Sequence, residues 1–284
     1  MIVGLLLAIG ALFACNGLDN ENTVPQMSSS QTFNLAFKAI SGDQDAVCGA
    51  TLTGYGEDKK QSISIRDIRF YVNNLKFYDI KGKELPVELT VNEFQYQDIE
   101  QGYATTLIDL TGNSIGSCTA SIGTERTNNH VTGVVSEGVI HAVSFDISMG
   151  LPRMNALRTP EPPNTQQSPF TEMQWSWVFG MIDMLIDYSA INEDGIGSRG
   201  FLNLGPVWME NFYPSVHLDN FSPSTNTITL DLKALLKDAE ILGTECHGGT
   251  SGICGTVYTN MGVDYSDTAA ITHDASKNTV FSFQ

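Results

Sequence analysis

Cysteines are the residues whose chemistry is easiest to define in this chain of 284 residues. Cys15 closes the apolar run 2–14, which has the length of a signal-peptide core and is too short to span a bilayer. The residues Leu12-Phe13-Ala14-Cys15 resemble a bacterial lipobox, in which the leader is cut before the cysteine and the thiol is acylated. We therefore expect lipidation of Cys15 and a membrane-anchored chain at the bacterial cell envelope, facing the periplasm or the cell surface.

The start of the chain lacks one feature of a lipoprotein leader. No Lys or Arg precedes Lys38, so the usual basic segment is missing, and we expect the true start to lie further upstream. The alternative is an ordinary signal peptide followed by an incidental cysteine. Residues 16–32 are polar with little to bury, which is typical of a flexible tether.

The remaining four cysteines, Cys48, Cys118, Cys246 and Cys254, form an even set, which in an exported chain indicates two disulfide bonds. Cys246 and Cys254 enclose a short glycine-rich loop, so we expect them to pair with each other and leave Cys48 to pair with Cys118. The alternative is a cysteine metal site. Thiolate zinc sites usually show two-residue spacings, which are absent here, so the sequence favours disulfides.

A serine in a glycine-rich turn is a candidate nucleophile. Residues 112–116, Gly-Asn-Ser-Ile-Gly, match the G-x-S-x-G pattern of serine hydrolases, which requires a strand before it and a helix after it. The residues that follow show no helical period. We therefore interpret the match as a plain glycine turn and expect a protein that is not an enzyme.

Histidines and methionines are the other side chains that could hold a metal. No two histidines lie two or four positions apart, so each is more typical of a solvated side chain than of a ligand. The clustered methionines could offer thioethers to Cu(I), but methionine also fills irregular cores, and packing is favoured. The candidates are His130, His141, His217, His247 and His273, and Met149, Met154, Met173, Met181 and Met184.

The charge of the chain excludes one class of partner. Lys and Arg number 15 against 32 Asp and Glu, which gives a formal net charge of −17. Because phosphate contacts need a basic surface, we expect no nucleic-acid binding and poor binding of anionic lipid headgroups.

Residues 64–89 are the stretch that organises the fold. Ile68, Phe70 and Val72 alternate with polar or amphipathic residues, which predicts a half-buried strand. The apolar phase flips at Asn73 and Asn74, which predicts a bulge or bend there. A polar turn at 81–83 then leads into a returning strand over 85–89. Such a bent hairpin needs a second sheet to cover its apolar face.

Strand patterns dominate the rest of the chain. They occupy 33–37, 106–110, 139–148, a second long bent strand over 173–188, 201–205 and two short strands within 215–230. Leu232, Leu235, Leu236 and Ala239 follow a helical spacing, the only convincing helix pattern in the mature chain. The predicted fold class is all-β, a two-sheet β-sandwich with one short C-terminal helix. The predicted organisation is a signal peptide (1–14), a lipidated cysteine and tether (15–32) and one sandwich domain (33–284).

Several segments, in this order, resemble the MbnP-like family of exported copper-binding proteins, also called the metallo-mystery pair four-Cys proteins. No single piece is specific, but the ordered set spans nearly all of the mature chain. The pieces are 33–37, Cys48, 67–74 with the turn at Gly82, 107–109 ahead of Cys118, 149–152, 173–177, 226–236 and the closing pair Cys246 and Cys254.

The resemblance implies a periplasm-facing β-sandwich that binds one copper ion. It also implies a dihaem partner of the cytochrome c peroxidase type, which in relatives oxidises a tryptophan of the binding protein to kynurenine. Trp175 and Trp177 are the motif tryptophans here, and Met173, Asn155 and Asn203 stand with them as possible walls of the site.

Departures from the family pattern fall on metal ligands. Where the family usually has Asn-His, this chain has Asn155-Ala156, and where it usually has His-Leu-Gly, this chain has Asn203-Leu204-Gly205. Neither alanine nor an amide replaces imidazole well as a copper ligand, so we expect the inherited site to be lost or rebuilt. The functional expectation is copper binding or handling at the envelope. The alternative is a metal-free surface module that interacts with an outer-membrane protein.

Overall fold

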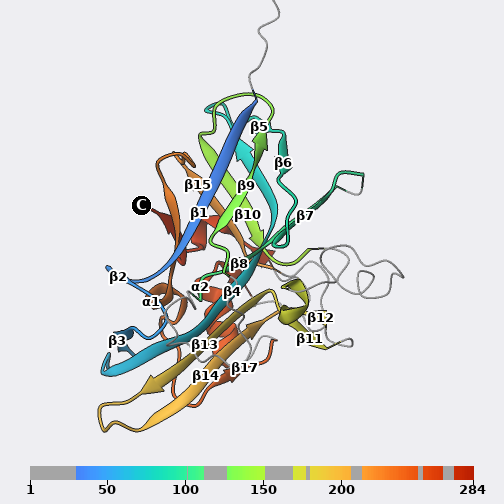
Figure 1. Cartoon of the computed structure of the whole chain (residues 1–284). Helices are drawn as coiled ribbons and strands as arrows, with labels where there is room; N and C mark the ends of the chain where they lie inside the picture. Colours follow the sequence, from blue (N-terminus) through green and yellow to red (C-terminus); the bar gives the residue numbers. More distant parts are fainter. Residues whose placement is uncertain are drawn as a thin grey trace, which may run out of the picture.

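Two packed β-sheets form the fold of this protein (Figure 1). The structure is a computed structural model, which describes residues 30–100, 102–111, 127–150, 169–176, 180–205, 213–248, 252–264 and 272–284. The described strands confirm the predicted all-β sandwich. The six-stranded sheet has the order β20 (Phe281–Phe283), β16 (Thr227–Asp231), β1 (Gln31–Ser41), β9 (His130–Val135) and β6 (Val87–Leu89), with β2 (Gln44–Asp45) beside β1.

The ten-stranded sheet is larger and branched. Its main path is β15 (Ser215–Asp219), β10 (Ala142–Ile147), β4 (Gln61–Tyr78), β13 (Met184–Ile191), β14 (Gly197–Leu204) and β17 (Glu245–Cys246). Four further strands branch from β4: β3 (Thr51–Tyr55), β5 (Glu84–Leu85), β8 (Tyr103–Asp109) and β7 (Gln95–Asp98), the last through β8. Two small hairpins pair β11 (Gln174–Ser176) with β12 (Gly180–Met181) and β18 (Val263–Asp264) with β19 (Thr272–His273).

Strand β4 is the backbone of the larger sheet. It runs for 18 residues and is long enough for several strands to share each of its edges. Strands β3, β8 and β5 pair in turn along one edge, and β13 followed by β10 pair along the other. Most residues of β4 therefore pair with a neighbouring strand on at least one edge, as a buried strand requires.

The main core lies between the two sheets. Aromatic rings from both sheets meet there: Phe37 of β1 lies 5.8 Å from Phe70 of β4 and 5.7 Å from Phe145 of β10, in edge-to-face geometry. Ile68, Phe70 and Val72 all belong to this core, as their alternation predicts. Edge-to-face pairs of this kind add stabilisation of about 0.5–1.5 kcal/mol beyond area burial.

The opposite face of β4 is buried as well, which differs from the predicted half-buried strand. Arg69 and Tyr71 are both 0% exposed. A second, smaller core covers Tyr71 on this outer face of the ten-stranded sheet, and it includes Leu107, Met149, Phe170, Met173, Ile182 and Leu185. Alternation of polar and apolar residues predicted solvent on that face because it carries no information about a covering segment distant in the sequence.

The predicted bend at the asparagine pair is present. Asn74 has a positive φ of 52°, and the pairing of β4 with β10 shifts register between Asn73 and Lys76. Asparagine tolerates this left-handed conformation better than most residues, and its Nδ2 donates a hydrogen bond to Asp146 Oδ2 at 3.0 Å. The bulge returns Phe77 to the main core.

Two strands differ from the sequence expectations. The returning strand pairs with β4 only at β5, because Pro86, which has no N–H to donate, precedes β6 in the other sheet. The expected long strand over 173–188 is divided into a 3₁₀ turn, η4 (Phe170–Met173), the β11–β12 hairpin and β13.

Two α-helices occur among the described residues. The predicted one is a single turn, α1 (Leu232–Leu235), capped by Asp231, which accepts a hydrogen bond from Lys233 N. The other, α2 (Ile253–Asn260), was missed because its sequence, ICGTVYTN, is rich in β-branched residues and glycine. Neither is long and apolar enough to cross a bilayer.

We predict that the backbone conformation of residue 74 limits stability. Asn74→Val and Asn74→Gly both remove the hydrogen bond to Asp146, but only valine is strained at positive φ. Asn74→Val should therefore lower the free energy of unfolding by about 2 kcal/mol more than Asn74→Gly, measured by urea denaturation. Equal destabilisation by the two variants would show that the bend is not conformationally demanding.

Candidate functional site

The motif residues of the sequence converge on the outer face of the ten-stranded sheet. Asp109 of β8 lies opposite Arg69 of β4, Arg69 lies opposite Leu185 of β13, and Leu185 lies opposite Asn203 of β14. Directly opposed residues of neighbouring strands project from the same face. The four side chains therefore form one row across the sheet, on the face covered by η4.

An ion pair buried under η4 is the strongest electrostatic feature of this row. Arg69 donates from Nε and Nη2 to the two carboxylate oxygens of Asp67, at 2.9 and 2.5 Å. Its Nη1 lies 3.6 Å from Glu172 Oε2, on η4, and makes no hydrogen bond with a described residue. Burial lowers the pKa of Arg69, but Asp67 and the neighbouring carboxylates outweigh burial and raise it overall.

Asp109 is the carboxylate with the most perturbed acidity in the row. Burial raises its pKa from 3.8 to about 6, against the hydrogen bonds that Thr111 donates to it. Thr111 also donates from Oγ1 to Asp67 Oδ1 at 2.9 Å, so the two carboxylates share one threonine. The cluster holds three acidic side chains around a single guanidinium, and a proton on Asp109 relieves part of that imbalance.

Met173 lies in the small core of this face. Its backbone oxygen accepts a hydrogen bond from Ile182 N at 2.7 Å, and its side chain is 0% exposed. The Tyr71 ring stacks on Phe170 at 5.9 Å and its hydroxyl donates to Phe170 O at 3.0 Å, which fixes η4 on the sheet. Met149 occupies the same core, so two thioethers gather on the motif face.

Asn203 lies at the edge of this core. It stands opposite Leu185, a member of the core, and Leu204 O accepts a hydrogen bond from Asp183 N at 2.7 Å. The Asn203 Oδ1 atom is buried and makes no hydrogen bond with a described residue. The structure thus places Met173 and Asn203 on one face of the sheet, near the start of β13. Their role as walls of a site stays a prediction.

The other motif residues are placed only in part. Trp175 belongs to strand β11, which directly follows η4. Trp177, Asn155, Cys15, Cys118 and the turn 112–116 lie outside the described residues.

Histidines do not gather into a site within the described segments. No group of three or more His, Cys, Asp or Glu side chains there is arranged to hold a metal ion. His247 is the imidazole nearest in register to Asn203, because Glu245 and Cys246 pair in parallel with Phe201 and Leu202 of β14. Its Nε2 lies 3.2 Å from Glu245 Oε2, and its ring packs edge-on against Phe201 at 4.8 Å. The sequence did not single out His247, since the β14–β17 pairing is non-local.

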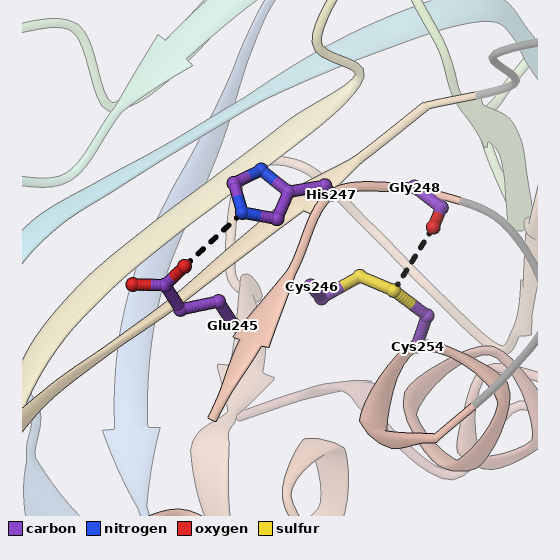
Figure 2. The surroundings of a disulfide bond; sticks show 5 residues. All are labelled: Glu245, Cys246, His247, Gly248 and Cys254. Atoms are coloured by element: carbon purple, nitrogen blue, oxygen red, sulfur yellow. Dashed lines mark hydrogen bonds and ion pairs between the residues drawn. A yellow bond between two sulfur atoms is a disulfide. The ribbon is translucent and has the colours of Figure 1, made fainter. Parts of the chain in front are cut away.

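A disulfide holds strand β17 in place. Cys246 and Cys254 are bonded, which is the pairing that the sequence predicts, and the bond joins β17 to helix α2. Figure 2 shows Glu245 and His247 on the side of β17 away from the sulfur atoms. The Cys254 Sγ atom lies 3.3 Å from Gly248 O. Cys48 is disulfide-bonded too. Its pairing with Cys118 stays a prediction.

The fold and the disulfides define a disulfide-bonded β-sandwich protein. The chain belongs to the MbnP family, whose model matches residues 30–251. Its fold is similar to that of MbnP from Methylosinus trichosporium, with a TM-score of 0.63 and 20% identity over 90% of this chain and 98% of that one. At that identity the likeness concerns the fold alone. No curated protein matches the chain.

We predict that Asp109 makes the fold less stable at neutral pH. Because its pKa is raised in the folded state, the folded protein binds the proton more tightly than the unfolded chain does. The contribution of this group to stability therefore falls as pH rises from about 4 to about 6. Asp109→Asn removes that fall, so its stability relative to the wild type should rise by up to about 3 kcal/mol over this range.

Denaturation at a series of pH values measures this effect. Asp79→Asn is the matched control. Hydrogen bonds from the Lys83 and Lys81 backbone lower the pKa of the exposed Asp79, so its pH dependence should have the opposite sign. Parallel stability curves for the wild type and Asp109→Asn would contradict the prediction.

Proposed function

We propose that this MbnP-family protein is a non-enzymatic lipoprotein that handles copper at the bacterial cell envelope, anchored through acylated Cys15. The observation that carries the proposal is the family match over 30–251 together with the placement of Met173 and Asn203 on the same face of the ten-stranded sheet. By family resemblance, a dihaem protein of the cytochrome c peroxidase type is the partner we propose for it.

The donors on this face fit Cu(I) as the cargo. Met149 and Met173 supply soft thioether sulfur, which suits Cu(I), and both are buried among apolar side chains. Asn203 supplies a harder amide oxygen, which is a weak copper ligand. A dry, apolar surrounding also favours the lower charge of Cu(I) over Cu(II). The two methionines are therefore the side chains that would hold the ion.

We predict that Met173→Leu weakens Cu(I) binding. The wild type should bind about one equivalent, and loss of one ligand should reduce the affinity at least tenfold, since even outer partners of metal ligands contribute roughly 10–100-fold. Titration of the purified mature chain against a chromogenic Cu(I) chelator measures both quantities.

Met184→Leu is the control for this titration. Met184 is as buried as Met173 but belongs to the main core between the sheets. Exchange of methionine for leucine conserves volume, so both variants should fold. Binding far below one equivalent at micromolar copper, or equal effects of the two variants, would sink the copper proposal.

A second candidate is a metal-free surface module that binds an outer-membrane protein. It is favoured by Asn203, which stands where the family usually has histidine, and by the lack of a metal-holding group of His, Cys, Asp or Glu in the described segments. In this case the protein keeps the β-sandwich fold of the family but has lost the ability to bind copper.

Restoring both imidazoles separates the two candidates. If the site is lost, neither Cu(I) nor Cu(II) should change the melting temperature of the wild type. Asn203→His with Ala156→His should then gain a copper-dependent rise of roughly 5 °C or more at saturating metal. The control carries glutamine at both positions. A reproducible copper-dependent rise in the wild type would count against the metal-free module.

A further inference from the structure

Two exposed apolar side chains project from one end of the ten-stranded sheet. Ile80 and Val139 are each 77% exposed. Tyr78 of β4 pairs with Ala142 of β10, and His141 N donates to Tyr78 O at 2.8 Å. Ile80 follows Tyr78 by two residues and Val139 precedes His141 by two, so both lie beyond the last paired residues, at the same end.

The chain enters the fold at this end. Gln31, the first residue of β1, pairs with Val135 of β9, and Val139 follows in the connection from β9 to β10. Figure 1 shows β1 beginning at the top of the molecule, beside β5. Residues 16–30 separate Gln31 from Cys15. They cannot hold this end more than about 55 Å from the anchor, whatever their conformation.

The charged side chains of the turns that carry Ile80 and Val139 balance one another, in contrast to the chain as a whole. Lys76 pairs with Glu84 at 3.1 Å and Lys83 pairs with Glu137 at 2.9 Å. The nearby carboxylate of Asp79 offsets the positive charge of Lys81. The whole chain carries −17. These turns can therefore approach a membrane surface without the repulsion that the net negative charge of the protein would cause.

The turn that carries Ile80 is held in shape. Asp79 Oδ1 accepts hydrogen bonds from Lys81 N at 2.8 Å and Lys83 N at 2.9 Å, and Asp79 N donates to Lys83 O at 2.9 Å. Gly82 supplies the positive φ of 77° that the turn needs. Ile80 thus projects from an ordered turn. Its burial in a lipid layer would therefore lose little further conformational entropy.

We propose that the Ile80–Val139 end is a membrane-contact surface, which docks on the lipid leaflet that holds the acyl chains of Cys15. The inference rests on the lipid anchor proposed above. It assigns an orientation: β4 stands with its Tyr78 end against the bilayer and its Gln61 end away from it. The contact is apolar, so zwitterionic lipid is sufficient.

The opposite end of the sheet offers a matched control. Ile191 and Ile196 flank the β13–β14 turn and are 42% and 66% exposed. Ile191 pairs with Ser62, at the Gln61 end of β4. Lys60 lies there too, 3.0 Å from Glu193. The two ends thus carry similar apolar pairs and one reporter lysine each, Lys81 and Lys60.

The experiment measures labelling of Lys81 relative to Lys60 by a water-soluble amine reagent, read by mass spectrometry. The lipidated full chain is reconstituted in vesicles of phosphatidylethanolamine and phosphatidylcholine and compared with unanchored Cys15→Ser chain in solution. The Lys81/Lys60 ratio should fall at least about tenfold on vesicles, because burial of two apolar side chains favours the docked state by more than that factor. Ile80→Ser with Val139→Ser should abolish most of that fall, and Ile191→Ser with Ile196→Ser should leave it intact.

Three results would overturn the inference, and they differ from one another. An unchanged ratio with Cys15 acylated, as read by mass spectrometry, removes the contact surface and leaves the anchor standing. An unacylated Cys15 in membrane-isolated protein removes the anchor first. Protection of Lys81 in solution that increases with protein concentration shows that a second copy, not lipid, covers this end.

Discussion

The solvent-inaccessible guanidinium of Arg69 is the group that most constrains how this fold is built. Arg69 lies on a strand that is covered on both faces, so its charge must be met by groups that the fold brings to it. Asp67 meets it from the same strand, and Glu172 approaches it from η4. The segment that carries Met173 is thereby held against the sheet by electrostatics as well as by the stacking of Tyr71 on Phe170. Pairing of this one buried cation therefore contributes to the position of the motif segment on the sheet.

Local patterns in the sequence were sufficient for the elements that face the main core. Ile68, Phe70 and Val72 lie in that core, and the phase flip at Asn73 and Asn74 marks a real bulge, because residue alternation and asparagine's tolerance of positive φ are properties of the strand itself. The outer face was not predictable in the same way. Arg69 reads as a solvated side chain until η4, about a hundred residues later, is known to cover it.

The candidate site shows the same division. Met173 and Asn203 could be connected from the ordered motifs, and the structure places them at the start of β13. His247 was one of five candidate histidines, but it could not be connected with Asn203, because its nearness to Asn203 depends on parallel pairing of β14 with β17 and on a disulfide to α2 that fixes β17. No spacing rule within a single segment encodes a parallel contact across more than forty residues. Clusters built from such contacts require the fold before they can be recognised.

The two edges of β4 differ in how far along the sequence their partner strands lie, which affects the order in which the sheet can form. One edge is completed by β3, β5 and β8, which are all close to β4 in sequence, whereas the other waits for β10 and β13, supplied much later. Long-range pairing of this kind is slow to form. Until residues 142–191 arrive, a nascent chain therefore exposes an open, apolar strand edge that other chains can join. The delay between completion of the two edges sets how long other chains can pair with a nascent chain before its own later strands do.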